Sequence, residues 1–206
     1  MDIEFDRKSG WSPTRARLQE TLLPLLAWAV LSGPGNAQAF CFTWNTPEFF
    51  VAAEPADVRR CLAEGADVNA RDDDGMTPLH WATRIGFWQT VATLLVTGAG
   101  VNARNEHGWT PLHFAVDSGN PLNVSAVLVA GADIEARTEE GFTPLHLATK
   151  ARTRYVERLV EVLLDAGADA KARAMNGRTP FDFAEENADY LAGTVVYWRL
   201  FEAQFQ

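Results

Sequence analysis

Three histidines at a fixed spacing are the residues of this sequence best suited to acid–base or metal chemistry. His80, His113 and His146 each follow Thr-Pro-Leu, and 33 residues separate each one from the next. Catalytic groups and metal ligands have to converge on one point. Residues that recur with a repeat lie one repeat apart along a stack, so these histidines cannot meet at one substrate atom. We expect them to have a structural role.

The other chemical motifs are weaker. Residues 71–75, Arg-Asp-Asp-Asp-Gly, look like a calcium loop, but Met76 falls on a ligand position and no glutamate stands at the closing position. No cysteine–histidine metal spacing and no phosphate-binding glycine loop occurs. The sequence therefore predicts no catalytic site, no metal and no cofactor, and the chain is not expected to be an enzyme.

Cys41 and Cys61 are the only cysteines of the chain. In an oxidising compartment this even count is compatible with one disulfide. The alternative is two buried free thiols, with Cys61 a core residue of its helix. The spacing alone leaves both open, because a disulfide also needs suitable geometry.

An eight-residue motif supplies the elements that position these residues. It occupies residues 75–82, 108–115 and 141–148, and a weaker copy occupies residues 177–184. Its glycine permits a tight turn, its threonine can cap a helix, and its proline suits the first helical position. A second motif, with a glycine suited to ending a helix, follows at residues 65–70, 98–103, 131–136 and 167–172. This self-similarity predicts stacked helix pairs.

These two motifs in phase closely resemble the ankyrin-repeat family over about residues 43 to 206. The resemblance implies an all-α fold, a curved solenoid of antiparallel helix pairs joined by hairpin-like loops. It also implies that each motif histidine bonds to its own threonine and to neighbouring backbone. We expect a domain over residues 40–206, with a cap unit at 43–70, repeats at 71–103, 104–136 and 137–172, and a C-terminal cap at 173–206.

Residues 1–39 lie outside the repeats and have the order of a secretory signal peptide. Arg15 and Arg17 precede an apolar run at 22–31, and Ala37-Gln38-Ala39 matches a cleavage site. The run is too short to cross a bilayer. The alternative is an amphipathic helix packed on the repeats. We expect an exported bacterial protein, periplasmic or secreted, with no membrane span after cleavage.

The net charge of −9 disfavours nucleic acid and anionic membranes as partners. The resemblance implies a protein partner, bound through the turn tips and the concave face, and we expect a monomer. The residue between the motif's glycine and threonine should be exposed and form an apolar stripe. Its alternative role is to stiffen the hairpins by packing. The predicted binding residues, stripe and tips together, are Asp73, Asp74, Met76, Glu106, His107, Trp109, Glu139, Glu140, Phe142 and Arg178.

Two function classes remain open. One is an exported, non-catalytic interaction module. The other is an intracellular regulatory or inhibitory subunit that keeps its N-terminal helix. The first residue of the native protein separates them, because cleavage after Ala39 would leave Phe40 at the start.

Overall fold

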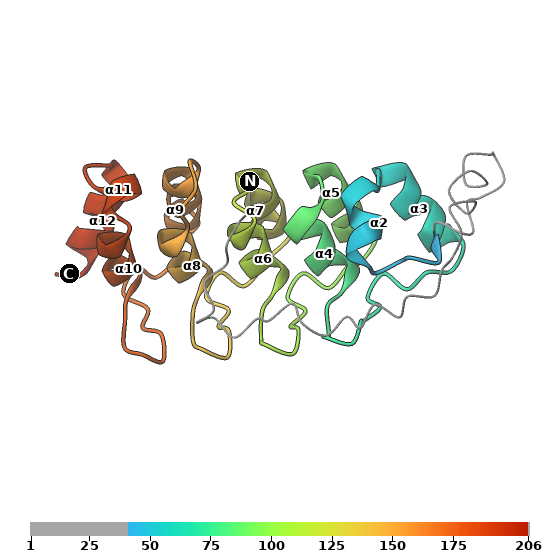
Figure 1. Cartoon of the computed structure of the whole chain (residues 1–206), viewed down its shortest axis with the longest axis horizontal. Coiled ribbons are helices and arrows are strands. Elements are labelled where there is room, and N and C mark those ends of the chain that lie inside the picture. Colours follow the sequence, from blue (N-terminus) through green and yellow to red (C-terminus); the bar gives the residue numbers. More distant parts are fainter. Residues whose placement is uncertain (1–40, 206) are drawn as a thin grey trace, which may run out of the picture. The chain divides into compact units, whose positions relative to one another are not determined.

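The computed structural model describes residues 41–205, and within them the regular elements are all helices. Figure 1 shows the helices standing in pairs side by side, with the loops before α4, α6, α8 and α10 projecting to the same side. The helices are α2 Pro47–Ala52, α3 Pro55–Ala63, α4 Pro78–Ile85, α5 Trp88–Val96, α6 Pro111–Asp117, α7 Pro121–Val129, α8 Pro144–Lys150, α9 Val156–Asp165, α10 Pro180–Glu186, α11 Ala188–Leu191 and α12 Val195–Ala203. The predicted signal segment at 1–39 lies outside the described residues.

The first helix of each pair begins where the motif predicts. Each starts at the motif proline and is preceded by an extended threonine, as Thr77 precedes α4. At this position proline lacks only an N–H that would have no helical partner. The next leucines, Leu79, Leu112 and Leu145, are fully buried, and so are the motif alanines. The motif therefore fixes both the start of the helix and the face that it buries.

The second helices α5, α7 and α9 complete the core. Val91, Leu94, Val124 and Val127 are fully buried, as helical spacing predicts. The neighbouring leucines, Leu95 and Leu128, fit the same helical spacing but are only half-buried. Successive pairs pack on one another, first helix against first helix and second against second.

The hairpin loops stack by backbone hydrogen bonds between repeats. The Glu106 amide donates to the Asp74 carbonyl, the Glu139 amide to the His107 carbonyl, and the Met175 amide to the Glu140 carbonyl, each at 3.1 Å. Gly141 turns the loop with φ at 78°, and a Cβ there would lie 2.9 Å from the Met175 amide nitrogen. Glycine is required at this position both by the turn and by the next repeat.

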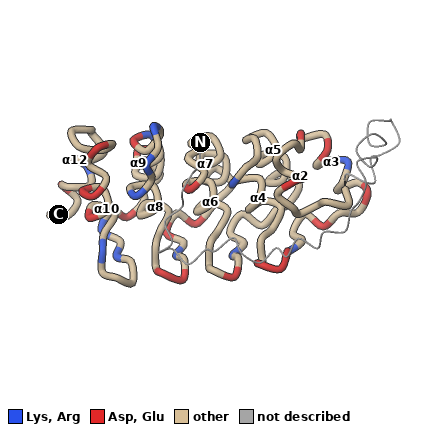
Figure 2. The backbone as a smooth tube through the Cα atoms, viewed as in Figure 1, with Lys and Arg blue, Asp and Glu red and all other residues tan. Residues whose placement is uncertain are grey.

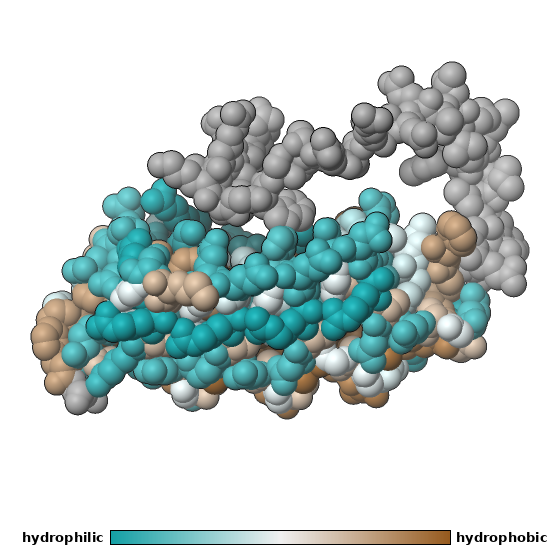
Figure 3. Space-filling view, turned by 90° about the horizontal axis from the view of Figure 1, so that it is seen from below, coloured by the Kyte–Doolittle hydropathy of each residue, from teal (hydrophilic) through white to brown (hydrophobic). Residues whose placement is uncertain are grey.

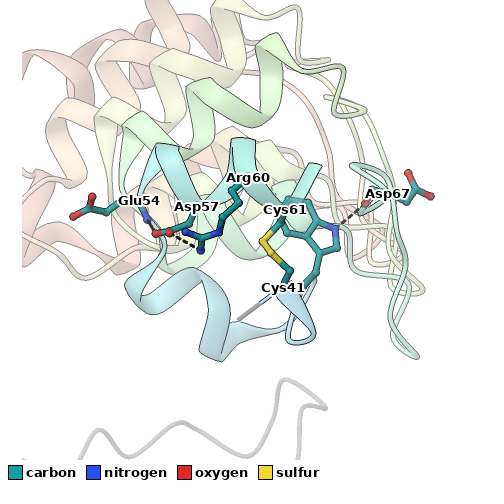
Figure 4. The surroundings of a disulfide bond; sticks show 7 residues. Cys41, Glu54, Asp57, Arg60, Cys61 and Asp67 are labelled. Atoms are coloured by element: carbon teal, nitrogen blue, oxygen red, sulfur yellow. Dashed lines mark hydrogen bonds and ion pairs between the residues drawn. A yellow bond between two sulfur atoms is a disulfide. The ribbon is translucent and has the colours of Figure 1, made fainter. Parts of the chain in front are cut away.

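The N-terminal unit is fastened by a disulfide between Cys41 and Cys61, whose Cα atoms lie 5.3 Å apart (Figure 4). Cys61 is fully buried. Next to it, the Trp44 indole donates to the Asp67 carbonyl at 2.8 Å and packs edge-on against Phe49. The disulfide thus ties the first described residue to α3.

The repeat at 137–172 is three residues longer than the two before it, and the extra length lies in the loop between α8 and α9. Arg152, Arg154 and Tyr155 are exposed, with the Arg154 guanidinium 4.7 Å above the Tyr155 ring. The Asn187 amide donates to the Ala151 carbonyl at 2.8 Å and so holds this loop from the following repeat.

The C-terminal helix α12 packs on α9 and α10 through the buried residues Val196 and Leu200. It occupies the position expected of the C-terminal cap. Its outer side keeps Val195 and Trp198 exposed, so the helix covers the last repeat but presents apolar side chains to water.

Candidate protein-binding surface

The motif histidines are buried parts of the helix starts. In the repeat at 104–136 the Thr110 amide donates to His113 Nδ1 at 3.1 Å, and the Thr110 hydroxyl lies 2.9 Å from the same nitrogen. His113 Nε2 lies 3.2 Å from the Phe142 carbonyl of the next repeat. Since Nδ1 accepts the amide, the ring proton is on Nε2, and the histidine bridges two repeats.

His80 and His146 repeat this arrangement. Burial lowers the pKa of His80 and of His113 to about 4, and it also lowers the pKa of His146. Neutral rings held by fixed backbone partners are suited to stabilising the stack and have no nitrogen left for a substrate. Within residues 41–205 no three His, Cys, Asp or Glu side chains gather as metal ligands.

The acidic tips are exposed, as expected of Asp73, Asp74, Glu106, Glu139 and Glu140. His107 is exposed beside them. Figure 2 shows acidic residues at the tips of the loops before α4, α6 and α8, whereas basic residues flank the loop before α10. The remaining acid of the calcium-like loop, Asp72, is engaged inside its own hairpin by the Met76 amide at 2.8 Å and the Trp81 indole at 2.9 Å.

The predicted exposed apolar stripe is wrong. Met76 is 3% exposed, and Trp109 and Phe142 are half-buried. The Trp109 ring lies 5.0 Å from the Phe114 ring, and the Phe142 ring lies 5.6 Å from the Phe183 ring of the next repeat. These side chains pack against the first helices and stiffen the hairpins, which is the alternative that the sequence left open.

Arg178, the last member of that stripe, is engaged within the chain. Its guanidinium lies 2.8 Å from a Glu186 carboxylate oxygen and 3.8 Å from the Phe183 ring centre. Seen from the hairpin side, the surface is mostly hydrophilic, in rows that cross successive repeats, with hydrophobic residues in separate patches (Figure 3).

A different surface emerges on the first helices, where two rows of equivalent residues run from repeat to repeat. The first row consists of the residues that follow the histidine position, and the second row lies three residues further along each helix. We call the two rows together the inner face. The first row is Trp81, Phe114, Leu147 and Phe183, and the second is Arg84, Asp117, Lys150 and Glu186.

The first row belongs to the core only in part. Phe114 and Phe183 are buried, whereas Trp81 and Leu147 are half-buried and keep an accessible surface. Sequence reasoning missed the second row altogether. The signal was available, since the four residues stand seven positions after the motif threonines and their charges alternate in sign.

Comparison with known proteins agrees with this geometry. A family model described as ankyrin repeats, three copies, matches residues 49–138, and a model of a single ankyrin repeat matches residues 140–174. The chain belongs to the ankyrin-repeat family. This confirms the predicted all-α stack of helix pairs, and ankyrin repeats imply a protein–protein interaction module.

A vapyrin-like protein of Medicago truncatula is similar to part of this ankyrin-repeat chain. The two are 39% identical over 60 residues, which is 28% of this chain and 13% of the plant protein. The chain thus matches only a small part of that relative's length. The similarity does not bear on a bacterial origin, which stays a prediction.

None of the helices α2 to α12 is long and apolar enough to cross a membrane.

Proposed function

We propose that this ankyrin-repeat domain is a non-catalytic module that binds a protein partner on its inner face and on its acidic hairpin tips. The observation that carries the proposal is the pair of rows on the inner face. A partner there would meet half-buried apolar side chains flanked by charges, the mixture found where interfaces have a dry centre and a polar rim. The tips stand beside this face and add negative charge.

Paired variants test the binding face. Leu147→Ala with Lys150→Ala alters the inner face, whereas Glu157→Ala with Arg158→Ala alters exposed residues of the second helix α9. The immobilised domain is used to capture protein from an extract of its source cells. We expect the inner-face pair to weaken capture by at least about tenfold and the α9 pair to leave it unchanged. Equal capture by both folded variants would refute the proposal.

We further propose that the domain acts outside the cytoplasm, after loss of residues 1–39. The disulfide supports this proposal, because structural disulfides persist in oxidising compartments. Mass determination and N-terminal sequencing of the native protein test it. A start at Phe40 with no free thiol is expected. An intact Met1 with two free thiols would instead favour the intracellular regulatory or inhibitory subunit.

A further inference from the structure

The second row of the inner face alternates in charge along three successive repeats. Arg84 is positive, Asp117 negative and Lys150 positive. Each stands three residues after the apolar residue of its own helix, and residues at this spacing share a helix face. The charges therefore form a line beside the apolar row, one charge per repeat.

Aromatic rings lie beside the two positive charges of the second row. The Arg84 guanidinium lies 5.7 Å from the Trp81 ring centre and 5.9 Å from that of Phe114. The ammonium of Lys150, an exposed residue, lies 5.9 Å from the Phe142 ring centre. Positive groups over aromatic faces are attracted by the ring electrons. The charged groups of Arg84 and Lys150 thus lie beside aromatic rings of the stack.

Asp117 interacts electrostatically with both cations of the row, Arg84 and Lys150. The residue keeps an exposed edge, yet its surroundings partly bury the carboxyl. This burial raises the pKa of Asp117, and the positive charges of Arg84 and Lys150 oppose that rise. The Asp117 carboxylate is thus stabilised by a positive charge in each of the two neighbouring repeats.

The distance between successive charges of this row favours one secondary structure for a partner that matches them. Packed helices lie roughly 8–10 Å apart, and we take this distance as the step between successive first helices, which pack on one another. A helix rises 1.5 Å per residue, so about seven residues, two turns, cover that step and return to nearly the same face. An extended strand covers it in about three residues, and an odd number places the middle side chain on the opposite face.

We propose that the partner segment is an α-helix lying along the inner face, with an acidic, a basic and an acidic side chain at successive seven-residue intervals. These face Arg84, Asp117 and Lys150 in turn. Apolar side chains between them rest on Trp81 and Leu147. The proposal rests on the proposed function, and it specifies the chemistry and the register of the partner.

Two helix-stabilised synthetic peptides test the register. Both carry leucines toward the apolar row. The matched peptide has Glu, Lys and Glu at seven-residue intervals, and the inverted peptide has Lys, Glu and Lys. By fluorescence anisotropy at low salt we expect the matched peptide to bind at least about tenfold more tightly, with a smaller difference at high salt. The net charge of −9 favours the inverted peptide non-specifically, so this preference cannot come from bulk charge. Equal affinities, or binding of neither peptide, would overturn the proposal.

A charge reversal at the central position gives the second arm. The Asp117 residue keeps an exposed edge through which a lysine side chain can reach water, so Asp117→Lys should fold. It should lose affinity for the matched peptide by about tenfold and regain it when the central Lys of that peptide is replaced by Glu. Glu157→Lys on α9 makes the same charge change away from the inner face and should leave both affinities unchanged. Loss of affinity without this regain would overturn the register.

The two proposals fail separately. If the inner-face double variant no longer captures the native partner while the peptides show no preference, the binding face is supported and the helical register is refuted. If the matched peptide binds more tightly than the inverted one while both double variants capture the native partner equally, the register is supported and the proposed function is refuted.

Discussion

Acidification should destabilise this domain through its buried histidines. Burial lowers the pKa of His80 and His113 from 6.5 to about 4, so the unfolded chain binds protons over this interval and the folded chain does not. Stability from such depressed pKa values is fully present above pH 6.5 and is lost as the pH falls toward 4. Between pH 7 and pH 5 the linkage amounts to about 2 kcal/mol for each of these two histidines. His146 acts in the same direction.

A histidine replacement isolates this effect from the carboxylates. Burial raises the pKa of Glu135, which stabilises the fold as the pH falls and opposes the histidines. This contribution is common to the wild type and to His113→Gln, and it cancels when the two are compared. Glutamine can bond the Thr110 amide from the same helical position without titrating.

Urea unfolding at pH 7, 6 and 5 at constant ionic strength gives the measurement. We expect His113→Gln to be less stable than wild type at pH 7 but to lose about 2 kcal/mol less on going to pH 5. If the two proteins lose the same free energy between pH 7 and pH 5, the buried neutral histidine bridge is refuted.

Three further outcomes follow from packing and covalent structure. Leu112→Ala should lower the free energy of urea unfolding by roughly 2–5 kcal/mol, since Leu112 is fully buried; a loss under about 1 kcal/mol would contradict the core. Cys41→Ser should lower the free energy of unfolding by about 3 kcal/mol, the value for a disulfide that closes a loop of 20 residues. In the unfolded, non-reduced wild type no thiol should react with a maleimide reagent. Reaction at Cys61 would contradict the pairing. Trp109→Ala should lower the free energy of unfolding by about 1–3 kcal/mol because the ring is half-buried. Met175→Ala, at a residue 80% exposed, is the control and should change it by under about 0.5 kcal/mol. Equal losses would show that the Trp109 ring is exposed rather than packed in the hairpin.

The helix starts were predictable because their signal is local. Threonine followed by proline fixes a cap and a first helical residue, and α4 begins at Pro78 as the motif predicts. Helix ends carry a weaker local signal, and α5 ends at Val96 with Thr97 as its C-cap. The histidine bonds were expected from the family resemblance, and their partners in the following repeat agree with it.

Exposure along the hairpins was not predictable, because it depends on the next repeat rather than on the residue's own turn. Met76 is covered from both sides: the Asn45 amide donates to its carbonyl at 3.1 Å, and the Asn105 amide lies 3.5 Å from its sulfur. An apolar residue beside a turn tip looks exposed in one repeat and is buried once repeats stack. The inner-face charges were readable in the sequence by comparing equivalent positions, but the position of Arg84 beside Trp81 and Phe114 required the structure.

Site-specific photo-crosslinking to the native partner tests the binding face most directly. A photoreactive amino acid is placed at position 150 on the inner face, at position 106 on a hairpin tip, or at position 157 on α9, and each protein is irradiated in an extract of the source cells. We predict that positions 150 and 106 crosslink to the same protein and that position 157 does not. Crosslinking of that protein through position 157 alone would place the partner on the second helices and contradict the inner face.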